Sequence, residues 1–150
     1  MKKFLSCLLL LTIFSCKESD KDADVAENNI DAARKFIGAA LQGKFDQAKT
    51  FMVQDSVNLN YLEVAERSYQ KMDPETKNNY RAASINIHNV SEPIKDSVTV
   101  VIFSNSFKND HDTLKVLHLE GKWLVDLKYL YEHAMDTTLN KIITKDSLPK

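Results

Sequence analysis

The stretch that decides the fold is TLKVLHLEGKWLVD, residues 113–126. Apolar and polar residues alternate on both sides of a short polar centre, which is the pattern of two half-buried strands joined by a tight turn. Gly121 followed by Lys122 suits a two-residue turn with glycine first. This stretch therefore predicts an antiparallel hairpin.

The register of this hairpin divides its side chains between two faces. The expected turn pairs Glu120 with Trp123, and the second strand is expected to continue to Tyr131. One face then carries Trp123 and Tyr129, and we expect it to lie under the helices. The other face is half polar and includes Asp126.

Upstream of the hairpin, the apolar period changes from 3.6 to 2. The second half predicts strands at 85–88 and 97–105, with turns at 91–93, 105–110 and 121–122. The first half predicts helices at 29–42, 45–52, 58–72 and 74–82, with Asn29 and Asp73 as caps. Because each element alone would leave its apolar side in water, the helices must cover one face of the sheet. The sequence predicts an α+β fold in which N-terminal helices pack on an antiparallel sheet of about four strands.

Short motifs along both halves resemble a known family. They are Phe36-Ile37, Ala40-Leu41, Gly43, Phe45-Asp46, Ala48 and the hairpin Glu120 to Val125. Over residues 25–131 the chain resembles small secreted lipoproteins of the nuclear transport factor 2-like, or cystatin-like, superfamily. The resemblance implies a cone, in which a curved sheet wraps on helices and often encloses a pocket. A strand pair often found between the early helices has only residues 57–59 as its candidate here. Members include isomerases, dehydratases and domains without known catalysis, so the fold does not supply the function.

The first sixteen residues indicate export. Two lysines precede the apolar run 4–14, and a small residue, Ser15, precedes Cys16. The box 13–16 resembles that of bacterial lipoprotein precursors, which are cut before the cysteine and acylated on it. The run is too short to span a membrane, which needs about 20 apolar residues. Ordinary secretion with a free Cys16 is the alternative.

The predicted organisation follows from this signal. Residues 1–15 form the signal peptide, 16–24 the lipidated cysteine and a polar tether, 25–131 the cone domain and 132–150 a tail. The other cysteine, Cys7, lies in the segment that is removed, so no disulfide or thiolate site is expected. Lipid on Cys16 would hold the protein in the cell envelope, with the outer membrane as the expected site. The charged tract after Cys16 also resembles those that direct lipoproteins to the cell surface, although a plain linker explains it equally well.

Composition excludes several classes of function. The chain has 20 basic and 21 acidic residues and a formal net charge of -1, and its lysines and arginines are scattered, so nucleic-acid binding is not expected. The histidines lack HxH or HExxH spacing and the glycines stand alone, so neither a metal nor a cofactor is predicted. The segment Asp110-His111-Asp112 is the one compact ligand-like group, and a solvated turn is the expected explanation.

Few side chains are candidates for acid–base catalysis. His118 and Asp126 could form an acid–base pair by residue type, but the expected register puts them on opposite faces. His118, with Trp123 and Tyr129, is a candidate to line a pocket. Asp126 is instead expected in a surface ion pair beside Lys115 and Lys128.

Three helical tyrosines complete the candidates. Tyr61, Tyr69 and Tyr80 either donate their hydroxyls into a pocket or belong to the core.

One tripeptide pattern recurs five times. An aspartate, then serine or threonine, then valine, leucine or threonine resembles an O-glycosylation acceptor of exported bacterial proteins, with sugar on the middle hydroxyl. The alternative is that these pairs cap helices and open strands. The candidate sites are Ser56, Ser97, Thr113, Thr137 and Ser147.

The expected function is a membrane-tethered envelope lipoprotein whose domain binds a small molecule or an envelope protein without catalysis. The alternative is a small pocket enzyme of isomerase or hydratase type. An enzyme would need two or more titratable side chains that converge in one apolar cavity.

Overall fold

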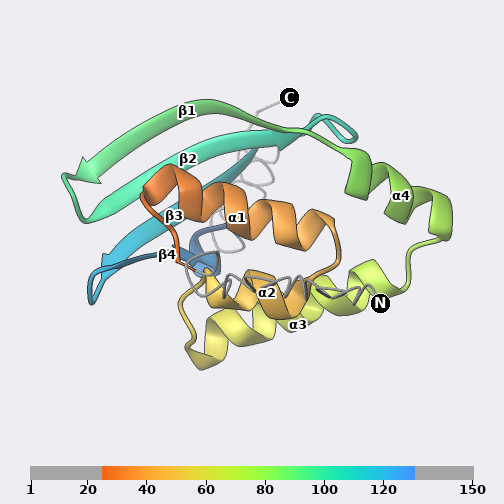
Figure 1. Ribbon diagram of the computed structural model, residues 1–150, viewed down its shortest axis with the longest axis horizontal. Coiled ribbons are helices and arrows are strands. Elements are labelled where there is room, and N and C mark those ends of the chain that lie inside the picture. Colours follow the sequence, from red (N-terminus) through yellow and green to blue (C-terminus); the bar gives the residue numbers. More distant parts are fainter. Residues whose placement is uncertain (1–24, 131–150) are drawn as a thin grey trace, which may run out of the picture.

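The computed structural model describes residues 25–130 and has an α+β fold. Its helices are α1 (Asn29–Leu41), α2 (Phe45–Thr50), α3 (Ser56–Gln70) and α4 (Pro74–Ala82), and its strands are β1 (Ile85–Ile94), β2 (Val98–Asn105), β3 (Asp112–Leu119) and β4 (Lys122–Asp126). The strands form one antiparallel sheet in the order β1-β2-β3-β4. Figure 1 shows the curved sheet with α1 lying across one face. The predicted fold class is confirmed, whereas the expected signal peptide, tether and tail lie outside the described residues.

Side-chain caps determine where the helices begin. The Asp73 carboxylate accepts the Thr76 N–H at 2.9 Å, and Pro74 occupies the first turn of α4, as predicted. The expected cap of α1 was wrong by one residue, because Asn28 accepts the Asp31 N–H while Asn29 is already helical.

The beginning of α3 also differs from the prediction. Asp55 accepts the backbone N–H groups of Val57 and Asn58, so the helix begins at Ser56 rather than near Asn58. A cap of this kind satisfies donors that the first turn cannot pair internally. Residues 57–59 are therefore helical, and the prediction of a strand candidate there was wrong.

The β3–β4 hairpin turns one residue earlier than expected. Glu120 and Gly121 both have positive φ angles, of 50° and 76°, which matches a two-residue turn whose twist fits the flanking strands. Trp123 consequently pairs with His118 rather than Glu120. Over residues 114–126 the two faces keep their expected members, because this shift moves each partner by two residues. Tyr129 was expected on the inner face, but it lies beyond β4 and its ring is near Lys115 Nζ, on the outer face. The chain turns helical at 127–130, so the prediction of a strand up to Tyr131 was wrong.

The expected turn at 91–93 is also wrong. Strand β1 continues through Pro93 to Ile94, with a register irregularity after Ser91, and the chain turns at Asp96, whose φ is 57°. Proline is tolerated here because β1 is an edge strand and its missing N–H costs no internal ladder bond.

The core lies between α1 and the inner face of the sheet. Ala32 and Ala33 of α1 are fully buried, as are Val101, Val116 and Val125 on the strands. The small alanine side chains let the helix approach the sheet closely. Residues on the opposite, outer face of β2, such as Val98 and Val100, are only half-buried.

The chain after α2 closes one edge of this sheet. Val53 N–H donates to Val125 O, and Val125 N–H donates to Phe51 O, both at 2.9 Å. Met52 thereby forms a parallel bridge with β4. This pairing satisfies part of an otherwise open strand edge and links the helical half to the sheet.

Candidate ligand-binding cavity

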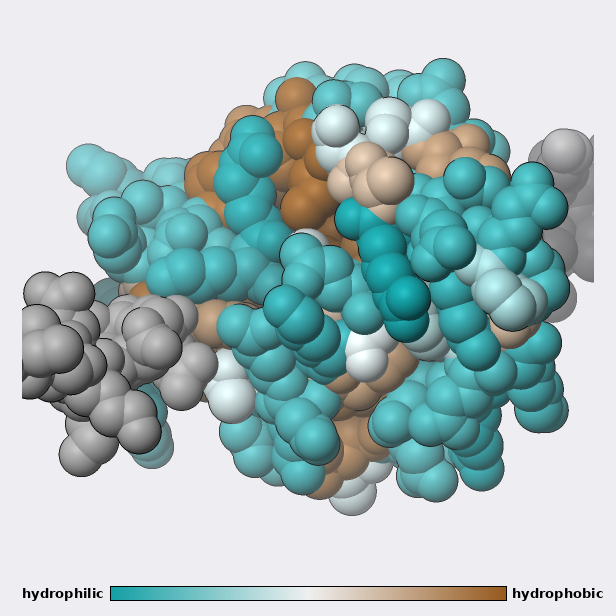
Figure 2. Space-filling model, turned by 45° about the vertical axis from the view of Figure 1, so that its right-hand side comes forward, coloured by the Kyte–Doolittle hydropathy of each residue, from teal (hydrophilic) through white to brown (hydrophobic). Residues whose placement is uncertain are grey.

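A cavity of about 440 Å³ lies between the helices and the sheet. Phe36 and Ile37 of α1, Leu62 and Ala65 of α3, and Phe103 and Leu114 of the sheet are among its apolar lining residues. Cavities of roughly 300–1,000 Å³ with apolar walls are typical of small-molecule sites. On the α4 side of the molecule, Figure 2 shows apolar side chains recessed between hydrophilic ones.

Polar residues line the cavity at the end of the sheet where β2 and β3 are joined. They are Asn105, Lys108, Asp110 and Asp112. Asp112 is the register partner of Phe103, and cross-strand partners share a face, so its side chain lies on the same side of the sheet as the core. The cavity therefore combines apolar walls with a polar rim at the β2–β3 end of the sheet.

Asn105 organises this loop. Its Oδ1 accepts the N–H groups of Phe107 and Lys108 at 3.1 and 3.0 Å, while its backbone oxygen accepts the Asn109 N–H at 2.8 Å. Asn109 has a φ of 57°, a conformation that asparagine tolerates better than most residues. Asn105 is only 8% exposed. The hydrogen bonds of the buried Asn105 side chain thus fix the backbone of this loop.

The rim is electrostatically unbalanced. Partial burial, together with the charge of Asp110, raises the pKa of the Asp112 carboxyl. Asp112 as a whole residue is exposed, so this burial removes only part of its water. Within residues 25–130 neither carboxylate forms an ion pair or a side-chain hydrogen bond. Two acidic residues and one lysine, Lys108, thus line this rim with no ion pair between them.

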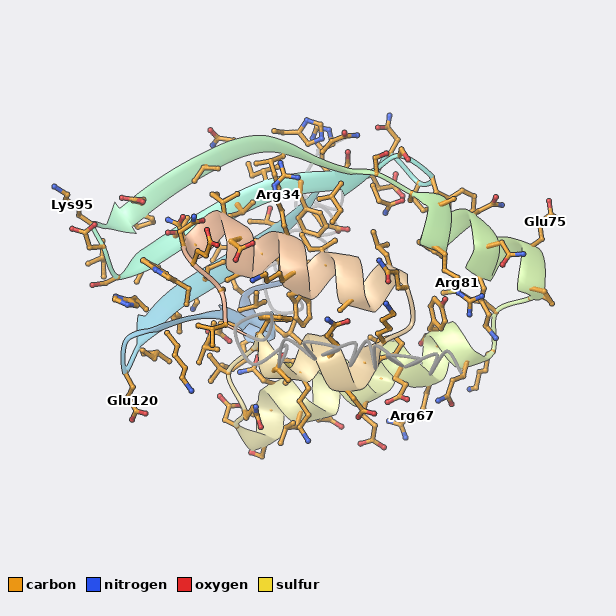
Figure 3. The ribbon with its side chains drawn as sticks, viewed as in Figure 1. Arg34, Arg67, Glu75, Arg81, Lys95 and Glu120 are labelled. Carbon is orange, nitrogen blue, oxygen red and sulfur yellow. The ribbon has the colours of Figure 1, made fainter. Side chains whose placement is uncertain are left out.

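Two of the three candidate tyrosines line the cavity. The Tyr69 ring packs edge-on against Phe45, with 5.6 Å between centroids, and its hydroxyl accepts a hydrogen bond from Arg81 Nε at 3.2 Å. Figure 3 shows Arg81 on α4, the helix that closes this end of the molecule. Tyr80 packs edge-on against Phe107 at 5.0 Å. The third, Tyr61, is partly buried against the core.

The residues expected to line a pocket lie elsewhere. The His118 ring stacks on Trp123, with centroids 4.4 Å apart, and its Nδ1 lies 3.2 Å from Asp96 O. Trp123 packs against the core, as its predicted face requires. Tyr129 lies past the end of β4, where its ring is 5.6 Å from Lys115 Nζ. The cavity lies at the other end of β3, near Asp112. The face of the hairpin that packs against the helices was therefore predicted correctly, but the end of that face that borders the cavity was not.

Asp126 belongs to a buried network rather than to a surface ion pair. It is 3% exposed, and its carboxylate lies 3.0 Å from Lys115 Nζ and 4.0 Å from Lys128 Nζ. The expected partners are therefore confirmed, but their exposure was wrong. His118 pairs with Trp123 and Asp126 with Lys115, so these two acid–base candidates lie on opposite faces, as predicted.

The glycosylation candidates stay predictions. Ser56 and Ser97 are exposed and Thr113 is half-buried, while Thr137 and Ser147 lie outside the described residues. At Ser56 the alternative explanation holds as well, because the preceding Asp55 caps α3.

Two further kinds of feature bear on function, membrane-spanning helices and metal-binding groups. Across residues 25–130 no helix is long and apolar enough to cross a membrane. The same residues contain no group of three or more His, Cys, Asp or Glu side chains placed to hold a metal ion.

No protein-family model, curated protein or solved structure matches this chain. The two family resemblances therefore stay predictions from sequence, and the geometry of the cavity has to carry the functional argument.

Proposed function

We propose that this chain is a lipid-anchored protein of the bacterial cell envelope whose domain binds a small, largely apolar molecule without catalysis. The observation that carries the binding proposal is the cavity of about 440 Å³ between helices and sheet. Close packing is the rule in protein interiors, and a hollow of this size lined by aromatic and aliphatic side chains forgoes contacts that a ligand would restore. A small molecule fits this observation better than a partner protein does, because the apolar surface is recessed.

Fluorescence of N-phenyl-1-naphthylamine tests the binding proposal. The dye is apolar, and its emission increases when it leaves water. We expect saturable binding to the wild-type protein and at least tenfold weaker binding to Ala65→Phe, because the larger side chain would occupy the cavity. Val64→Phe is the matched control, since Val64 is the neighbouring residue on α3 and is 40% exposed. Equal dye affinity in both variants would contradict the proposal.

The tether is supported by the sequence around Cys16. Several acyl chains on one cysteine bind a membrane stably, whereas one chain binds only marginally. We expect Cys16→Ala to leave the membrane fraction and to lose labelling by radioactive palmitate in the native host. Retention of the label in the variant would overturn this part of the proposal.

A pocket enzyme is the second candidate, favoured by the titratable groups that share the cavity. Asp112, with its raised pKa, is the residue best suited to exchange a proton. Binding remains the preferred function because both carboxylates sit on the exposed rim rather than among the apolar walls. If catalysis occurs, Asp112→Asn would abolish turnover of an isomerase or hydratase substrate while leaving the affinity for the neutral dye unchanged.

A further inference from the structure

We infer that the cavity selects amphipathic cations, with the apolar body of the ligand between the helices and the sheet and a protonated amine at the carboxylates of Asp110 and Asp112. This inference rests on the proposed function and adds the charge of the ligand's head group to it.

The sign of the head group follows from the charges on the rim. Asp110 and Asp112 both line the cavity, and neither is in an ion pair within the described part of the chain. Lys108 does not neutralise them, because its Nζ lies 5.5 Å from the Phe107 ring centroid and takes part in no ion pair there. The intervening His111 stacks on His88, with centroids 4.0 Å apart. A bound cation would relieve the repulsion between two nearby carboxylates.

Asn105 adds a hydrogen-bond donor to this end of the cavity. Asn105 lines the cavity and is 8% exposed, yet only its Oδ1 is used, by two backbone N–H groups of the loop. Those bonds fix the orientation of the amide, since the oxygen must face the donors. Its Nδ2 has no partner in residues 25–130. Every buried side-chain nitrogen or oxygen atom in these residues has a hydrogen-bond partner, so this Nδ2 is open to solvent, where it can donate to an oxygen acceptor on a head group.

Aromatic rings near the rim favour the same charge. Tyr80 and Phe103 line the cavity together with the two carboxylates. The face of an aromatic ring attracts ammonium groups, and sites that recognise organic cations combine such rings with acidic side chains. An anionic amphiphile would instead meet two like charges and only one lysine.

Isothermal titration calorimetry with three probes of equal chain length tests the inference. The probes are decylamine, 1-decanol and sodium decanoate, each at neutral pH and below its aggregation concentration. We expect decylamine to bind about tenfold more tightly than 1-decanol, which is the ratio expected for one charge-assisted hydrogen bond. Decanoate should bind more weakly than the alcohol.

Substitution of the two carboxylates tests whether they cause the preference for the cation. The double variant Asp110→Asn/Asp112→Asn should bind decylamine no more tightly than 1-decanol and should keep the wild-type affinity for the alcohol. Glu75→Gln is the control for loss of a negative charge away from the cavity, because Glu75 lies on the outer end of α4 (Figure 3). It should leave all three affinities unchanged.

The outcomes separate the two proposals. If 1-decanol binds but decylamine is not preferred, or if the double variant keeps the preference, the inference about the head group is overturned and the proposed function stands. If none of the three probes binds, both are overturned.

Discussion

Asn58 shows how a single buried amide can join two parts of this fold. Its side chain is fully buried, its Oδ1 accepts the Leu127 N–H at 2.7 Å, and its Nδ2 donates to the Asp55 carboxylate at 3.0 Å. The first bond holds the chain where it leaves the sheet, and the second strengthens the cap of α3. The Asp55 carboxylate also accepts a hydrogen bond from Lys128 Nζ at 2.8 Å. Helix α3 and the end of the sheet are therefore connected by polar contacts as well as by packing.

Removal of this amide should destabilise the protein. We expect Asn58→Ala to lower the free energy of unfolding by about 2 kcal/mol or more, because the buried Leu127 N–H would lose its acceptor. Urea denaturation followed by circular dichroism measures the change. Asn60→Ala, at an exposed position on the same helix, should change stability by less than about 0.5 kcal/mol. A similar loss in both variants would show that the bridge does not matter.

Asp55 should make the free energy of unfolding depend on pH. The Asn58 backbone N–H, followed by Lys128, lowers the pKa of Asp55 from 3.8 to about 2. A carboxyl whose pKa is lowered on folding stabilises the protein fully above pH 3.8, and the effect is lost as the pH falls through about 2. Asp55→Asn should therefore cost more stability at pH 7 than near pH 2. Asp46→Asn, in the first turn of α2, is the control, and a pH-independent cost for Asp55→Asn would refute the linkage.

At the scale of the structural elements, the junction between α1 and α2 is sterically constrained. Gly43 has a φ of 74°, and a Cβ atom placed there would lie 2.5 Å from Cε1 of Tyr69. Glycine allows this left-handed conformation and also the close approach of α3. Since Tyr69 lines the cavity, this junction fixes part of the cavity wall.

Two glycine substitutions separate these constraints. Gly121, in the β3–β4 turn, has a similar φ of 76°, but a Cβ atom placed there would have no atom within 4 Å. Gly121→Ala should cost only the backbone strain, about 1 kcal/mol, whereas Gly43→Ala should cost more and weaken dye binding by displacing Tyr69. Thermal unfolding and dye titration measure both effects. Equal losses of stability, with unchanged dye affinity, would contradict the role given to Tyr69.

Elements with a strong local signal could be predicted from sequence. The Asp73-Pro74 start of α4 and the inner face of the hairpin are encoded by neighbouring residues, and both predictions were confirmed. The exact turn was missed because Glu120 adopts a positive φ, which its residue type does not favour.

Features that depend on distant residues were less predictable. The sequence predicts only a solvated turn where the polar rim lies. The rim could not be predicted because Asn105 and Asp112 border the cavity only once α1, α3 and α4 are placed around it. The burial of Asp126 likewise depends on the fold, which brings Lys115 of the neighbouring strand to 3.0 Å from its carboxylate. Alternation along the predicted strand was the signal that could have placed one carboxylate on the inner face, because Asp112 lies two residues before the buried Leu114.

At the scale of the whole molecule, the two ends of the sheet differ. Near the β3–β4 turn, the stacked His118 and Trp123 rings lie beside the core, whereas the cavity opens near the β2–β3 loop. Figure 1 shows α4 beyond that end of α1 rather than against the sheet. The helices therefore cover the sheet unevenly, and the proposed site lies at the end where α1, α3 and α4 together line the cavity.

Methyl-resolved NMR during a titration with 1-decanol tests the binding claim most directly, because it locates the ligand without altering the protein. We predict saturable shifts of the methyl resonances of Ile37, Leu62 and Leu114, which line the cavity, and little change at Val98 and Val100 on the outer face. Shifts confined to the outer-face methyl groups, or no saturable shift at all, would contradict the claim that the cavity is a binding site.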